Sequence, residues 1–146
     1  MINVLLVDDH IYIRKAIQYL LAITKDINVV ATASNGVEAV TAARFSQPDV
    51  VVMDISMPVM DGLDATRKIL QEYPVMRVLM LSSFDTEEYI LRALKAGATG
   101  YMVKNAIAGE LVEAIRSLYG GMRYFCRQIR DKVNLYIEQD SDSRIV

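Results

Sequence analysis

The chain has 146 residues, of which 53% are hydrophobic and 23% charged, and its formal net charge is −2. These values are typical of one domain with a well-filled core, and they exclude a disordered chain and a general attraction to nucleic acid or anionic membrane. The single cysteine, Cys126, excludes an internal disulfide and favours a reducing compartment. No stretch approaches the roughly 20 apolar residues that span a bilayer, so we predict a cytoplasmic protein without membrane contact.

The first half of the chain alternates between strand-like apolar runs and helix-like amphipathic segments. In order, they are predicted at residues 4–7 (strand), 13–21 (helix), 28–33 (strand), 37–45 (helix) and 50–54 (strand). The first strand is followed by Asp8 and Asp9, and the third ends in Asp54. An apolar run as short as the third is typical of a strand buried on both faces of a parallel sheet.

The second half continues this alternation. In order, segments are predicted at residues 63–73 (helix), 77–81 (strand), 85–96 (helix), 99–103 (strand) and 109–119 (helix). Ser82 follows the fourth strand and Lys104 follows the fifth. Five strand–helix pairs predict an α/β fold: a doubly wound, five-stranded parallel sheet of flavodoxin-like order 2-1-3-4-5, with helices on both faces.

Residues 123–146 differ in character from the rest of the chain. Phe125, Ile129, Val133 and Tyr136 recur at helical spacing, and the segment ends in a polar stretch at residues 139–144. We therefore predict a domain at 1–122 followed by an amphipathic tail helix or linker at 123–146.

The predicted sheet brings several chemical groups to one edge. Asp8, Asp9, Asp54, Ser82 and Lys104 all follow or end strands, and the carboxyl ends of parallel strands are where such sheets bind ligands. Each close pair of carboxylates costs about 1 kcal/mol in water and about 4 kcal/mol at an effective dielectric near 20. A divalent cation would remove this repulsion, and oxygen ligands favour Mg²⁺ over zinc.

This group of side chains is suited to handling a phosphoryl group. A bound Mg²⁺ and the Lys104 ammonium would neutralise phosphoryl oxygens, and the Ser82 hydroxyl could donate a hydrogen bond to one of them. Asp54 could act as a nucleophile, which would give an aspartyl phosphate.

Residues 1 to about 122 resemble the receiver domain of two-component response regulators. The matching motifs are Val7-Asp8-Asp9, Asp54-Ile55-Ser56-Met57-Pro58, Asp61-Gly62, Leu81-Ser82-Ser83, Ala96-Gly97-Ala98 and Gly100-Tyr101-Met102-Val103-Lys104. The resemblance implies that Asp54 accepts a phosphoryl group from a sensor histidine kinase. It also implies that Asp9, Asp54 and the main-chain carbonyl of Ser56 bind Mg²⁺, with Asp8 acting through a metal-bound water.

The same resemblance implies a conformational switch. Lys104 would contact both Asp54 and the phosphoryl group, while Ser82 and Tyr101 would form the switch pair. The expected outcome is a population shift that promotes homodimers, with self-phosphorylation and slow self-hydrolysis but no external substrate, so the protein is not expected to be an enzyme.

Three further segments resemble the LuxR/NarL-type transcriptional regulators. They are the Asp-Asp-His after the first strand, residues 88–97 and residues 121–125. In that subfamily a helix-turn-helix domain follows the receiver, and DNA would be contacted only through it. The chain ends at Val146, before such a domain, so we expect either a piece of a longer regulator or a stand-alone receiver.

Several alternatives stay open. A pseudo-receiver would signal by protein contact alone. A small phosphatase with an aspartyl nucleophile commonly needs a second aspartate where Ser56 stands, and a flavodoxin-like cofactor module would need a phosphate-binding loop where Asp8 and Asp9 stand. His10 is expected to open the first helix and face solvent, and Phe84 could shield the phosphoryl group from water.

Overall fold

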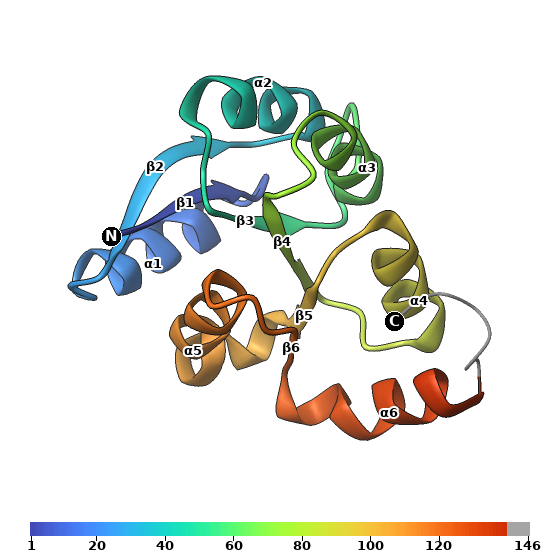
Figure 1. Cartoon of the computed structure of the whole chain (residues 1–146). Helices are drawn as coiled ribbons and strands as arrows, with labels where there is room; N and C mark the ends of the chain where they lie inside the picture. The colour runs from blue at the N-terminus through green and yellow to red at the C-terminus, as the bar shows by residue number, and fades with distance from the viewer. Residues whose placement is uncertain (140–146) are drawn as a thin grey trace.

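The computed structural model describes residues 1–139, which form one parallel sheet covered by helices (Figure 1). The strands are β1 (Ile2–Val7), β2 (Ile27–Ala33), β3 (Val50–Asp54), β4 (Arg77–Ser82), β5 (Gly100–Val103) and β6 (Tyr124–Phe125). Their order is β2-β1-β3-β4-β5-β6, and every neighbouring pair is parallel. The predicted order 2-1-3-4-5 is therefore confirmed, with a short sixth strand added at one edge.

Helices flank both faces of this sheet. They are α1 (Ile11–Ala22), α2 (Gly36–Ser46), α3 (Gly62–Glu72), α4 (Glu87–Ala96), α5 (Ile107–Tyr119) and α6 (Arg130–Gln139), with short 3-10 turns η1 (Lys104–Ala106) and η2 (Arg127–Ile129). Figure 1 shows α1 and α5 on one face and α2, α3 and α4 on the other. Within residues 1–139, no helix combines the length and apolar character needed to cross a membrane.

The burial of strands β1 and β3 explains why acidic groups lie in a buried environment. Residues 4–7 of β1 and 50–53 of β3 are fully buried, because helices cover both faces of the sheet there. The apolar run of β3 continues into Asp54, whose side chain is also buried. The hydrophobic effect that holds these strands in the core therefore fixes a carboxylate at the rim of a low-dielectric region.

The segment after α5 differs from its prediction. The prediction of a helix that starts at residue 123 is wrong, because Tyr124 and Phe125 pair with Gly100 and Tyr101 as strand β6. The outer edge of β5 has main-chain groups that need partners, and β6 supplies them. The Tyr124 amide donates to the Thr99 carbonyl at 3.1 Å and the Cys126 amide to the Tyr101 carbonyl at 3.2 Å.

The expected amphipathic helix is confirmed, but it begins later, as α6 at residue 130. Ile129 and Val133 are buried and Tyr136 packs partly against the core, as their helical spacing predicts. Beyond residue 139, the predicted polar stretch at 139–144 lies outside the part of the chain that the structure describes.

Candidate functional site

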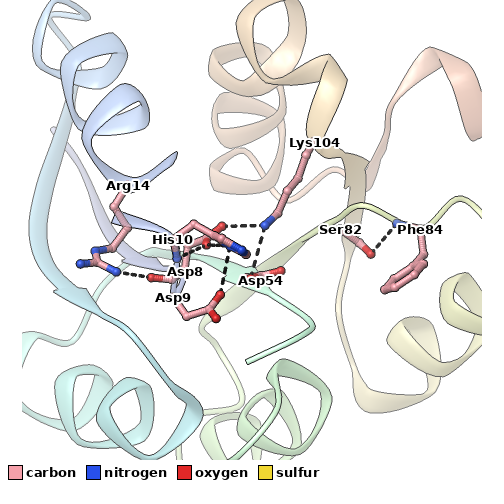
Figure 2. A network of polar contacts seen from close by, with 8 residues as sticks. All are labelled: Asp8, Asp9, His10, Arg14, Asp54, Ser82, Phe84 and Lys104. Carbon is pink, nitrogen blue, oxygen red and sulfur yellow. Dashed lines mark hydrogen bonds and ion pairs between the residues drawn. The ribbon is translucent and has the colours of Figure 1, made fainter. Parts of the chain in front are cut away.

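The carboxyl edge of the sheet brings the predicted acidic residues together. Asp8 follows β1, Asp54 ends β3, and both side chains are buried, whereas Asp9 is partly exposed. One ligand atom from each of Asp8, Asp9, His10 and Asp54 lies within 4.8 Å of the others. Figure 2 shows these side chains converging where β1 and β3 end. The geometry is that of a site for a cation with mainly oxygen ligands.

Lys104 reaches this group from the end of β5. Its Nζ lies 3.0 Å from Asp8 Oδ2 and 3.4 Å from Asp54 Oδ2, and its side chain is only 14% exposed (Figure 2). Both carboxylate oxygens are buried, and among the described residues they have no hydrogen-bond partner apart from this ion pair with Lys104. One ammonium therefore balances two buried carboxylates, which leaves the site with excess negative charge.

The pKa of Asp54 reports this imbalance. Burial, and then the charge of Asp8, raise the pKa of Asp54 from 3.8 to about 7, against the opposing effect of Lys104. Near neutral pH, keeping Asp54 in its ionised form therefore costs substantial free energy. A divalent cation beside Asp54 would lower that cost, so the residues present fit such a cation.

Two basic side chains that the sequence analysis did not place here also contact Asp8. His10, predicted to face solvent, begins α1 as its N-cap and is 60% exposed, but its Nδ1 lies 3.0 Å from Asp8 Oδ1 and 3.1 Å from Asp9 Oδ1. Arg14 Nη1 donates to the Asp8 carbonyl at 2.5 Å. Arg14 follows His10 by four residues, a spacing that puts both on one side of the first helical turn and could have signalled the contact.

Ser82 lies on the other side of the site and is bonded to its own loop. Its Oγ accepts a hydrogen bond from the Phe84 amide at 2.9 Å, and Figure 2 shows the hydroxyl beside Phe84 rather than joined to Asp54. The Tyr101 hydroxyl donates to the Phe84 carbonyl at 2.6 Å. Because burial raises the pKa of Tyr101 to about 12, its hydroxyl stays protonated as a donor.

Phe84 itself lies partly exposed beyond these hydrogen bonds. Its ring stacks on Tyr89 of α4, with centroids 4.4 Å apart and planes 9° from parallel. The guanidinium of Arg92, also on α4, lies 5.5 Å from the centre of the Tyr89 ring. A pocket of about 470 Å³ is lined by Tyr89 and Arg92 together with Asp9, Ser56 and Asp61. It gives solvent access to the acidic cluster.

The loop after β3 is held close beneath Asp54. Asp61 caps α3 by accepting from the Asp64 amide at 2.9 Å, and the Gly62 amide donates to the Ile55 carbonyl at 2.8 Å. A Cβ on Gly62 would lie 2.0 Å from the Asp54 carbonyl oxygen, so only glycine permits this approach. The Asp61-Gly62 motif therefore helps to fix the main chain that carries Asp54.

The fold and the site together define a class of protein. A parallel sheet of order 2-1-3-4-5, with acids at the ends of β1 and β3 and a lysine at the end of β5, is the arrangement of response regulator receiver domains. Residues 4–116 match the model of the response regulator receiver domain, and the chain belongs to that family. This is a family of signalling proteins rather than of catalytic enzymes.

Relatives narrow the assignment further. The chain is 42% identical over 135 residues to the response regulator GacA of Pseudomonas viridiflava, covering 92% of this chain and 63% of that protein. It is 44% identical over 135 residues to the response regulator UvrY of Escherichia coli (strain K12), covering 92% and 62%.

A solved structure agrees with these relatives. A two-component response regulator of the LuxR family from Aurantimonas sp. SI85-9A1 superposes with a TM-score of 0.87 at 34% identity, covering 92% of this chain and 96% of that chain. The predicted resemblance to LuxR/NarL-type regulators is thus confirmed. The chain spans only 63% of the length of the GacA protein that it matches.

Proposed function

We propose that Asp54 accepts a phosphoryl group from the phosphohistidine of a sensor histidine kinase. A carboxylate oxygen of Asp54 attacks phosphorus, the P–N bond breaks, and its electron pair leaves with the histidine nitrogen, so that an acyl phosphate remains on Asp54. The observation that carries this proposal is the buried Asp54 carboxylate, which lies 3.4 Å from Lys104 Nζ and within the cluster of acids.

Mg²⁺ is the metal that this site would use. Asp9, Asp54 and the main-chain carbonyl of Ser56 would hold it, and Asp8 would act through a bound water. When bound, the ion would neutralise charge on the transferring phosphoryl oxygens. Support comes from the buried Asp8 and Asp54 oxygens, which share the single ammonium of Lys104, and from the oxygen-rich set of ligands.

Lys104, Ser82 and Tyr101 would respond to the phosphoryl group. Lys104 would pair with one phosphoryl oxygen while staying near Asp54, and the Ser82 hydroxyl would turn from the Phe84 amide to donate to another. Tyr101 is already buried, with its hydroxyl on the Phe84 carbonyl. Movement of Ser82 would therefore be transmitted to Tyr101 through the main chain of residue 84.

The output that we propose is control of transcription in the cytoplasm. A phosphoryl group adds about −1.5 to −2 units of charge at the sheet edge, which would favour a second conformation and a homodimer. Contact with DNA would be made by a helix-turn-helix domain outside this chain. The LuxR-family relative from Aurantimonas supports this output.

Incubation with acetyl phosphate and Mg²⁺, followed by intact mass measurement, tests the proposed function. We expect one phosphoryl adduct per chain, and a loss of nearly all of it when a chelator removes the metal, because the acidic cluster then repels the anionic donor. No adduct in the presence of metal would contradict the proposal and would favour a pseudo-receiver. An adduct that forms equally well without metal would contradict the role of Mg²⁺.

Phe84→Ala is expected to shorten the lifetime of the acyl phosphate. The Phe84 ring, held by its stack on Tyr89, lies two residues beyond Ser82, where it can limit the approach of water. We expect hydrolysis to be faster by about 3- to 10-fold, equivalent to a barrier lower by roughly 1 kcal/mol. The measurement is the decay of the adduct after acetyl phosphate is removed, with Phe45→Ala on the exposed face of α2 as the matched control. An unchanged decay rate in Phe84→Ala would refute the shielding role.

A further inference from the structure

The segment after α5 is attached to the loop that joins β4 to α4. Gln128 Nε2 lies 3.5 Å from Asp85 Oδ2, and Lys132 Nζ lies 3.1 Å from the Asp85 carbonyl and 3.6 Å from Asp85 Oδ2. Figure 1 shows α6 beside this loop, far along the chain from it. Asp85 is three residues beyond Ser82, so the contact is made to the loop that would have to move on phosphorylation.

The segment that makes this contact is itself firmly anchored. Cys126, Ile129 and Val133 are buried in the core. The Tyr124 hydroxyl donates to Glu110 Oε1 of α5 at 2.6 Å, and the Arg127 amide donates to the same oxygen at 3.1 Å. Gln128 and Lys132 therefore extend toward Asp85 from a segment that is packed into the core.

The loop is consequently held from three directions. Within it, the Phe84 amide donates to Ser82 Oγ. From β5, the Tyr101 hydroxyl donates to the Phe84 carbonyl, and from the tail, Gln128 and Lys132 contact Asp85. In this arrangement the Ser82 hydroxyl is occupied as the acceptor for the Phe84 amide. A pocket of about 310 Å³ lies between Lys104, Asp85 and Gln128.

We propose that η2 and the first turn of α6 form a clamp on residue 85 that favours the unphosphorylated position of the β4–α4 loop. The clamp consists of Gln128 and Lys132 acting on Asp85. The proposal rests on the proposed function, because it supposes that a phosphoryl group on Asp54 draws Ser82 away from the Phe84 amide. For the loop to follow Ser82, the contacts to Asp85 must lengthen or break.

Thermodynamic linkage makes this coupling reciprocal. If phosphorylation weakens the clamp, then a weaker clamp must favour phosphorylation by the same factor. The docking of α6 would thus report the state of Asp54 through the β4–α4 loop. The tail becomes part of the switch rather than a passive extension of the receiver.

Lys132→Ala and Gln128→Ala, alone and together, test the clamp in the full chain. The probe is Mg²⁺ with beryllofluoride, a non-covalent analogue of the phosphoryl group. We expect the apparent affinity for beryllofluoride to rise about 2- to 5-fold in the double variant, since exposed polar contacts are individually weak. In the wild type, we expect beryllofluoride to increase amide hydrogen exchange in residues 127–136. We also expect faster exchange of these amides in Lys132→Ala without beryllofluoride, and helix propensity cannot cause it because alanine is a better helix former than lysine.

Matched controls separate the clamp from general effects of charge. Lys68→Ala removes an exposed lysine from α3, and Asn134→Ala changes an exposed position of α6; neither should alter affinity. Lys132→Arg keeps the charge and should behave as the wild type. Unchanged or reduced affinity in the double variant, or exchange in 127–136 that beryllofluoride does not alter, would overturn the clamp. If the proposed function itself were wrong, the wild type would form no adduct with acetyl phosphate. That result is distinct from a failure of the clamp alone.

Discussion

Asp54→Asn is expected to lower phosphorylation by acetyl phosphate at least about 100-fold, a loss of roughly 3 kcal/mol or more in transition-state stabilisation. The substituted amide is a poor nucleophile and a poor ligand for Mg²⁺, but it has nearly the same shape as the carboxylate. Intact mass measurement after incubation with Mg²⁺ and acetyl phosphate gives the fraction modified. Asp54 is buried at the end of β3 and lies 3.4 Å from Lys104 Nζ, which can neutralise a phosphoryl group placed there.

Asp64→Asn is the matched control for this experiment. Asp64 lies exposed in the first turn of α3, where it pairs with Arg67, and its substitution should leave the adduct unchanged. An adduct that persists in Asp54→Asn would show that another carboxylate accepts the phosphoryl group. In that case Asp9, the partly exposed acid of the cluster, would be the first position to examine by proteolysis and mass measurement.

Asp54→Asn is also expected to stabilise the metal-free fold, by an amount that depends on pH. The pKa of Asp54 rises from 3.8 to about 7 on folding, mainly through burial and then through the charge of Asp8. A group with a raised pKa destabilises the fold progressively as the pH increases from the unfolded to the folded value, by up to about 4 kcal/mol here. Because Lys104 and entering water can relax around the charge, we expect Asp54→Asn to raise the free energy of unfolding by on the order of 2 kcal/mol at pH 8.

Urea unfolding of both proteins between pH 4 and pH 8, in the presence of a chelator, measures this difference. The gain should be small near pH 4, where the folded carboxyl is protonated and the unfolded carboxyl is only about half ionised, and should level off above pH 7. Added Mg²⁺ should stabilise the wild type more than the variant, because the wild type has one more carboxylate ligand. A gain that is independent of pH would mean that the substitution acts through packing and not through the charge of Asp54.

Much of the site could be predicted from the sequence because it depends on local patterns. The apolar run of β3 ending in Asp54 identified a buried strand and its functional end, and the alternation of strands and helices predicted a parallel sheet, for which the order 2-1-3-4-5 was favoured and is confirmed. Parallel strands then bring Asp8, Asp54 and Lys104 to one edge without further information. These conclusions need only periodicity, chain direction and the handedness of crossover connections.

The rest was decided by contacts between segments that are distant in the sequence. The helical spacing of Phe125 and Ile129 was compatible with a helix, but the open edge of β5 made residues 124–125 a strand. The hydrogen bond of Tyr101 to the Phe84 carbonyl, and the contact of Lys132 with Asp85, join segments that lie far apart in the sequence. The sequence therefore determined which residues reach the site, because strand ends follow from local pattern. Only the tertiary structure decided how those residues are held, because hydrogen bonds between distant segments leave no periodic signal in the chain.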